Sequence, residues 1–253
     1  MALYQKYSKI IVDRHGDLQN SQMKTIEIIS EINPGKVYKI HKDSLIETES
    51  IEQVQTLSQR SYNVPNHVTF KDTILKDNYD SNKNTNSNIL GKNCILFLNE
   101  KDLQIPVAET TPDNLEYYGA VLFHIGDQIC LNHYNDLPVT KMNIGDNYVK
   151  GFLLNEELGG GCYLEYHNTP HFHMPLNEQA SGHLILGKIT DSGCQLSAFK
   201  IPYGCAIYTK PLTIHCDGYL TGDYLVVYTV TDSYLTMLLK NKENKAPVNV
   251  KIE

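Results

Sequence analysis

Short apolar or alternating runs of residues, separated by turn residues, follow one another through the C-terminal part of the chain. Runs of this length that are rich in β-branched and aromatic residues are typical of strands. About ten are present, at Cys94–Leu98, Tyr117–Ile125, Gln128–His133, Tyr148–Leu154, Gly161–His167, Gly182–Ile189, Gln195–Ile201, Cys205–Tyr208, Tyr224–Thr231 and Tyr234–Leu239. Because no helical pattern interrupts them, they predict a mainly β fold, either a barrel or a sandwich closed on itself.

The residues before this region mix apolar runs with charged segments. Ser21–Ile32 predicts a helix with an apolar stripe, which the following Asn-Pro-Gly sequence would end. Its β-branched residues favour a strand almost equally over the second half. Val37–Ile40 predicts a strand, and Ser50–Arg60 is a further candidate helix.

Lys76–Asn88 is almost wholly polar and rich in asparagine. Such a composition buries too little apolar surface to offset the entropy cost of ordering, so it predicts a long loop or linker. The chain therefore divides into an N-terminal α+β extension at 1–92 that ends in this loop, a β-barrel at 93–240 and a C-terminal tail at 241–253. We expect the extension to pack on the barrel or to extend its sheet.

The charge balance argues against two classes of partner. The 253 residues carry a net charge of -7, and Arg14 and Arg60 are the only arginines. Nucleic-acid binding needs clustered Lys and Arg, and an anionic membrane surface attracts a polybasic patch, so neither partner is expected. No apolar run approaches the ~20 residues of a membrane span.

The cysteines and the N-terminal residues bear on the compartment. The six cysteines include no C-x-x-C pair, and residues 1–30 contain no uninterrupted apolar stretch typical of a signal peptide. These features favour free, buried thiols over a disulfide framework. We therefore expect a cytoplasmic protein, with secretion by a leaderless route left open.

Three histidines fall within seven residues at His167, His171 and His173. Alternate side chains of a strand share a face, so His171 and His173 are expected to point the same way. Two converging imidazoles form half of a mononuclear metal site, and neighbouring strands must supply the remaining ligands. The other interpretation is that these are hydrogen-bonded histidines at a strand edge.

The same segment resembles the first motif of the cupin superfamily, through His171-Phe172-His173, then Glu178, then the run from His183 to Gly187. Ile201-Pro202-Tyr203-Gly204 resembles the Pro-x-Gly turn of the second cupin motif. The resemblance covers roughly residues 150–230. It implies a small β-barrel that holds one divalent metal through two His and a Glu of the first motif and a His of the second.

The second motif departs from the family pattern. Its expected His is replaced by Ile207, and the nearest substitute is His215. The resemblance therefore implies a metal site of His171, His173, Glu178 and His215, binding Fe, Mn, Zn or Ni. The function it implies is that of a metal-dependent enzyme acting on a small molecule. A metal-free binding module for a small ligand, or a protein-interaction module, is the alternative, and pairing of sheet edges between chains makes a homodimer possible.

Two other groups of residues have a second interpretation. Glu165 and His167 share a strand face and are either site residues or polar residues at a strand end. Ile10–Gly16, with Arg14-His15-Gly16, resembles the opening of the histidine phosphatases, with Arg60 as a second phosphate clamp. The alternating β and α pattern of that family is missing, which makes this a remote alternative.

Overall fold

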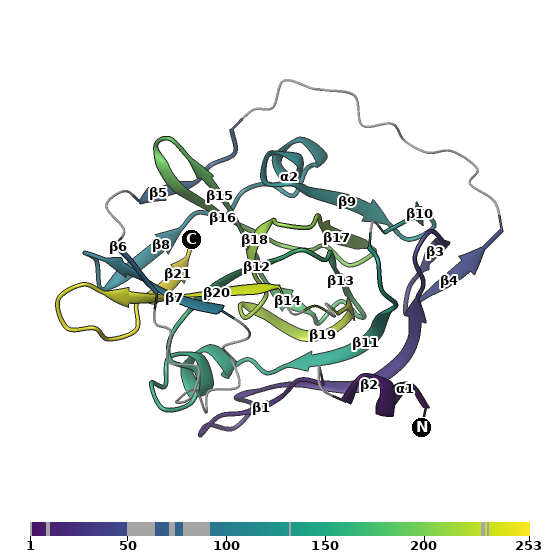
Figure 1. Cartoon of the computed structure of the whole chain (residues 1–253), viewed down its shortest axis with the longest axis horizontal. Helices are drawn as coiled ribbons and strands as arrows, with labels where there is room; N and C mark the ends of the chain where they lie inside the picture. Colours follow the sequence, from purple (N-terminus) through teal and green to yellow (C-terminus); the bar gives the residue numbers. More distant parts are fainter. Residues whose placement is uncertain are drawn as a thin grey trace.

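A computed structural model describes residues 2–8, 11–49, 64–70, 74–77, 92–131, 133–228, 231 and 233–253 of the chain. The fold is mainly β, as the sequence predicts, and two eight-stranded sheets form a nearly closed barrel. Figure 1 shows strands β12, β13, β17, β18 and β19 around the centre of the molecule.

The first sheet is antiparallel and begins with strands from the N-terminal region. In spatial order its strands are β1 (Asp13–His15), β2 (Gln22–Ile32), β11 (Leu137–Ile144), β19 (Leu220–Val227), β13 (His171–Pro175), β17 (Cys205–Thr209) and β9 (Ala120–His124), with β14 (Ser181–Gly182) also paired to β19. Because β2 pairs along the whole length of β11, the N-terminal region extends the sheet, as expected.

The second sheet contains the strand before the histidine-rich segment. In spatial order it consists of β5 (Val68–Phe70), β16 (Gly193–Phe199), β15 (Leu184–Thr190), β18 (Ile214–Cys216), β12 (Tyr163–His167), β20 (Tyr234–Asn241), β7 (Lys92–Leu98) and β6 (Ile74–Asp77). All of its pairs are antiparallel except β20 with β7.

Smaller elements cover the two large sheets. One small sheet has the order β10 (Gln128–Ile129), β3 (Val37–His41) and β4 (Ser44–Thr48), and the other pairs β21 (Asn249–Ile252) with β8 (Asp102–Ile105). Among the described residues the helices are α1 (Ala2–Lys6), which lies beside β2, α2 (Pro112–Tyr118) and a π-helical turn, η2 (Val149–Leu153). The predicted domain boundaries at 92/93 and 240/241 stay a prediction.

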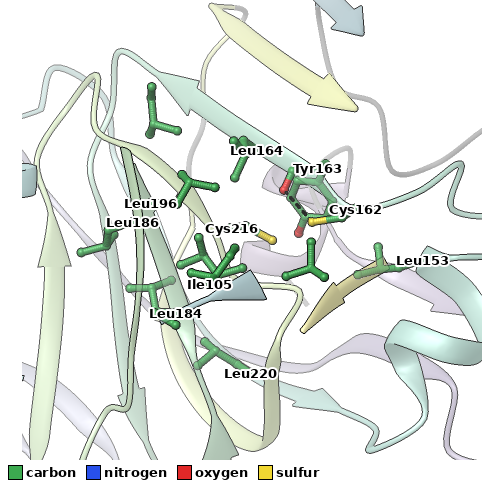
Figure 2. Packing of buried hydrophobic residues seen from close by; sticks show 14 of the residues in the cluster. Ile105, Leu153, Cys162, Tyr163, Leu164, Leu184, Leu186, Leu196, Cys216 and Leu220 are labelled. Carbon is green, nitrogen blue, oxygen red and sulfur yellow. Dashed lines mark hydrogen bonds between the residues drawn. The ribbon is translucent and has the colours of Figure 1, made fainter. Parts of the chain in front are cut away.

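Two apolar clusters fill the molecule. The larger one includes Leu164, Leu184, Leu196 and Leu220, which gather around the thiols of Cys162 and Cys216 in Figure 2. The smaller one lies where β3 and β4 cover the first sheet and includes Ile40, Leu45, Phe172, Met174 and Leu225. Strands of the first sheet are therefore buried on both faces.

The predicted helix at Ser21–Ile32 is wrong, since Gln22–Ile32 forms strand β2. Its residues pair with β11 through two irregularities in register, one at Val139/Thr140 and one at Lys141/Met142. Pairing with β11 gives hydrogen bonds to the backbone N–H and C=O groups of this segment, and β-branched residues are favoured in strands. These two effects outweigh the helical spacing of its apolar residues.

The expectation of a region without helices is also wrong, at two places. Tyr117–Ile125 begins in helix α2, which Thr111 caps by accepting a hydrogen bond from the backbone N–H of Asn114. Tyr148–Leu154 contains the π-helical turn η2 instead of a strand. Gly151 of this turn packs so closely on Ser21 that an added Cβ would lie 2.4 Å from the Ser21 Cβ. A short apolar run does not itself distinguish a strand from a buried helical turn.

Other predicted elements are confirmed or lie outside the described residues. Val37–Ile40 and Cys94–Leu98 are strands, β3 and β7. Ser50–Arg60 lies outside the part of the chain that the structure describes, and so does Lys76–Asn88 except for Lys76 and Asp77, which end β6.

Candidate metal centre

Strand β13 presents its histidines to the inside of the barrel. It lies between β17 and β19, and all of its residues are buried. Phe172 and Met174 belong to the apolar cluster on the outer side of the sheet. Because successive side chains alternate across a strand, His171 and His173 point to the opposite, inner side. The H-x-H pattern therefore places two imidazoles on one buried face, as predicted.

Strands β12 and β18 supply the facing side chains from the second sheet. Glu165 and His215 are directly opposite each other in the antiparallel register. His167 follows Glu165 by two residues on β12 and therefore lies on the same face. Two strands of one sheet thus bring a carboxylate and two imidazoles to the face opposite His171.

These side chains form a compact group. One donor atom from each of Glu165, His167, His171 and His215 lies within 4.8 Å of every other. The ring centroids are 4.7 Å apart for His167 and His171, 5.0 Å for His167 and His215, and 5.1 Å for His171 and His215. Three imidazoles and one carboxylate at this spacing are able to hold a metal ion.

Backbone carbonyls fix the tautomers of two of the rings. Nδ1 of His167 lies 2.6 Å from the carbonyl oxygen of Thr169, and Nδ1 of His215 lies 2.9 Å from that of Thr213. A carbonyl only accepts, so Nδ1–H donates in both rings, and Nε2 carries the lone pair whenever the ring is neutral. Histidines that bind metals are oriented by this kind of hydrogen bond.

Several buried imidazole nitrogens have no hydrogen-bond partner within the described part of the chain. They are Nδ1 of His171, Nε2 of His215 and both ring nitrogens of His173. Each unsatisfied buried group costs about 1–3 kcal/mol, so several in one place call for an explanation. A metal ion that accepts lone pairs from His171 and His215 would remove part of that cost, and the residues present therefore fit a metal.

Burial also keeps two of the rings neutral. Burial, and then the charge of His215, lowers the pKa of His167 to about 3. Burial and the neighbouring histidines lower the pKa of His171 well below its usual range. Burial opposes protonation of His215 as well, but the carboxylate of Glu165, 3.4 Å away, outweighs it and raises the pKa of that ring. His167 and His171 therefore stay neutral near neutral pH, which is the form of histidine that binds metals.

His173 faces a second polar group. Its Nε2 lies 3.6 Å from a carboxylate oxygen of Asp217, and Asp217 also accepts a 2.5 Å hydrogen bond from the hydroxyl of Tyr163. Burial opposes ionisation of Asp217, but His173, Tyr163 and the charge of Arg14 outweigh it and lower the pKa of this carboxyl. Asp217 is thus a buried anion beside the histidine group.

The structure brings together part of the ligand set that the sequence predicts. His171 and His215 belong to the group of four, and His173 lies beside it, with its ring centroid 5.3 Å from that of His171. Glu178 lies on an exposed turn after β13 and is not a member of the group. Ile207, at the place of the missing second-motif histidine, is buried directly opposite His173.

Glu165 and His167 belong to the group of four, whereas the sequence left open whether they are site residues or polar residues at a strand end. A signal for them exists, because two polar residues alternate along a strand that is otherwise apolar and leads directly into the H-x-H segment. Their strand parity was visible in the sequence, but the pairing of β12 with His215 was not.

Arg14 and His15 are not brought to one site. The side chain of His15 is 61% exposed and pairs with Asp13, whereas Arg14 is 7% exposed on the other face of β1. Close packing explains the glycine at position 16, because an added Cβ would lie 2.2 Å from the carbonyl oxygen of Gly151. Arg60, the second proposed phosphate clamp, lies outside the described residues.

Comparison with protein-family models, with curated proteins and with solved structures gave no match for this chain. Among the helices that the structure describes, none has the length and apolar character needed to cross a membrane. The functional argument therefore depends on the geometry of the site.

Proposed function

We propose that the protein is a metal-dependent enzyme of cupin type that acts on a small molecule. One divalent ion is held by Glu165, His167, His171 and His215. The observation that carries the proposal is the orientation of the imidazoles. Carbonyls hold His167 and His215 through Nδ1, which turns Nε2 of each ring to the other side, and Nδ1 of His171 is buried without a hydrogen-bond partner among the described residues. A purely structural cluster of histidines would leave Nδ1 of His171 without a hydrogen bond, which is a net cost.

The chain supplies a rigid and nearly dry setting for such an ion. The donors come from β12 and β18 in one sheet and β13 in the other, so regular backbone fixes each of them. A bound ion of Fe, Mn, Zn or Ni would supply Lewis acidity to a water or small ligand beside it. Glu165, opposite His215, is placed to balance the charge of the ion and to accept a proton from such a ligand.

Metal analysis tests this proposal directly. Protein purified without chelator should contain about one transition-metal ion per chain by elemental analysis. His171→Ala and His215→Ala should each abolish retention of the ion after dialysis, because each removes a lone pair that has no substitute nearby. A wild-type protein that stays metal-free after reconstitution with excess Zn, Fe, Mn and Ni contradicts the proposal and favours a metal-free binding or interaction module.

Paired variants distinguish the ligand set proposed from the structure from the one that the cupin motif implies. Glu165→Gln should lower metal affinity by about tenfold or more, whereas Glu178→Gln, at an exposed turn, should leave it unchanged. His15→Ala, on the exposed face of β1, is the control for loss of a histidine. The reverse result for the two Glu variants would restore the motif assignment.

Three further expectations belong to this proposal. A small-molecule ligand, a cytoplasmic location and a homodimer formed through sheet edges fit a protein of this kind. Size-exclusion chromatography with light scattering checks the homodimer.

A further inference from the structure

A groove of about 520 Å³ lies on the outer side of the second sheet, lined by residues of α2, β12, β15, β18 and the turn at 210–213. Tyr166 of the groove follows Glu165 on β12. Ile214 of the groove precedes His215 on β18. Because successive side chains of a strand alternate, both groove residues point away from the metal centre. A volume of this size is typical of small-molecule sites, so the groove is a second place for a ligand.

The groove offers apolar surface that is held in place. The rings of Tyr117 and Tyr166 and the side chain of Leu212 line it. The hydroxyl of Tyr117 donates a hydrogen bond to the side chain of Gln195, and its ring packs edge-on against that of Tyr118, with 5.0 Å between the centroids. A fixed aromatic ring is able to bind a flat apolar ligand with little loss of conformational entropy.

The groove also carries one surplus positive charge. Among the described residues that line it, the charged ones are Glu116, Lys188 and Lys210. Lys210 pairs with Glu116 at 2.7 Å. The ammonium of Lys188 has no carboxylate partner in the described part of the chain, and lies 4.2 Å from the centre of the Tyr117 ring and 3.1 Å from the carbonyl oxygen of that residue. An ammonium has three N–H donors, so Lys188 keeps a donor for a ligand.

Leu212 holds an unfavourable backbone conformation at the groove. Its φ is +66°, in the left-handed region that leucine disfavours, and the residue is 65% exposed, so packing does little to offset the strain. The turn is held by hydrogen bonds from the Leu212 N–H to the carbonyl of His167, at 2.8 Å, and from the Thr213 hydroxyl to that of Gly119, at 3.0 Å. A strained residue whose side chain stays exposed at a groove indicates a functional constraint.

We propose that this groove binds an aromatic acid that carries one negative charge. The acid group lies at the ammonium groups of Lys188 and Lys210, and the aromatic ring lies against Tyr166 and Leu212. The charge selects against an amine, and the apolar surface selects against a small acid such as acetate. None of the four residues of the proposed metal centre lines the groove, so this inference does not rest on the metal.

Equilibrium dialysis of the full chain against 2-naphthoate tests the ligand class. Wild-type protein should bind 2-naphthoate saturably, and acetate at equal concentration should not displace it. The 2-naphthylmethylammonium cation, which keeps the ring and reverses the charge, should bind at least about tenfold more weakly.

Opposite effects are expected from the two residues of the ion pair. Lys210→Gln should weaken 2-naphthoate binding by about tenfold, because it removes a cation and leaves the carboxylate of Glu116 unpaired in the groove. Glu116→Gln should strengthen binding by about threefold, because it frees the ammonium of Lys210 for the ligand. Lys141→Gln breaks an ion pair with Glu27 on the first sheet and is the matched control.

A glycine at position 212 tests the groove without risk to the fold. Leu212→Gly suits the positive φ, so it should keep or raise the unfolding temperature, and it should weaken 2-naphthoate binding by about threefold or more. Asn20→Gly, at a φ of +59° in the turn before β2, should leave binding at the wild-type value.

The outcomes separate this proposal from the metal site. Equal binding of the acid and the cation by the wild type overturns it, as does an effect of Lys210→Gln no larger than that of Lys141→Gln. Binding that is lost in His171→Ala but kept in Lys210→Gln would place the acid at the metal centre and overturn this inference alone. A wild-type protein that takes up no metal but binds 2-naphthoate with the expected variant pattern supports this inference and contradicts the metal site.

Discussion

The two faces of strand β13 are both buried, yet they differ in chemistry. On the outer face, Phe172 and Met174 pack in the apolar cluster between the first sheet and β3 and β4. On the inner face, His171 and His173 carry ring nitrogens without hydrogen-bond partners among the described residues. The outer face packs against other apolar side chains, whereas the inner face carries buried polar nitrogens whose loss of water costs free energy.

This contrast teaches that burial alone does not identify a core. All five residues of β13 are buried, and burial alone would therefore class β13 as an ordinary core strand. The division between apolar and polar side chains follows the two-residue period of the strand and not its position in the chain. Three predictions test the contrast.

The largest effect is expected on the outer face. Phe172→Ala removes a fully buried aromatic ring from a packed cluster, so it should lower the free energy of unfolding by about 3–5 kcal/mol. Urea unfolding of the metal-free protein measures this, and the metal content of the folded fraction should stay at the wild-type value. Loss of metal with no loss of stability would reverse the assignment of the two faces.

The pH dependence of stability should come from the inner face. In the metal-free protein the pKa values of His167, about 3, and of His171 are lowered by burial. As pH falls below about 6.5 the unfolded chain takes up protons on these rings and the folded protein does not. Stability is thus fully present above that pH and is lost below it, by up to about 1.4 kcal/mol per pH unit for each ring.

His215 acts in the opposite direction, because its pKa is raised in the folded protein. Its contribution is present at low pH and is lost as pH rises through the folded pKa. Urea midpoints of the metal-free protein between about pH 7 and about pH 5 should therefore fall on acidification, and less steeply in His171→Leu. A midpoint that rises on acidification would mean that the Glu165–His215 pair dominates.

The smallest effect is expected when one imidazole is replaced by an apolar side chain. His171→Leu removes a buried nitrogen that has no partner among the described residues, so the metal-free protein should keep its stability or gain about 1 kcal/mol. Thermal unfolding without metal measures the stability of the variant. The same experiment with added metal tests metal binding, since metal should no longer raise the unfolding temperature of His171→Leu. A loss as large as that of Phe172→Ala would show that the inner face is ordinary core.

The sequence predicts the β class and the inward pair at His171 and His173, because strand period and turn residues are local signals. It leaves open whether Glu165 or Glu178 lies beside these histidines, and the structure places Glu165 there. Which carboxylate faces His171 depends on how β12 pairs with β18, where Glu165 and His215 are about fifty positions apart in the chain. It also depends on how the two sheets face each other. Motif spacing carries no information about that pairing.

The π-helical turn and β2 teach the same lesson at the level of elements. Gly151 lies in close contact with Ser21, the residue before β2, and this contact between distant parts of the chain is not visible in the local pattern of residues 149–153. Local apolar runs leave this choice open. The parts of the fold that were predicted correctly are those decided by neighbours in sequence.

The burial of the four donor residues has a consequence for timing. Glu165, His167, His171 and His215 come from strands of both sheets, and the three histidines are buried. We therefore expect an ion bound at the proposed site to exchange with solvent only as fast as these strands open locally, so that its release is slow.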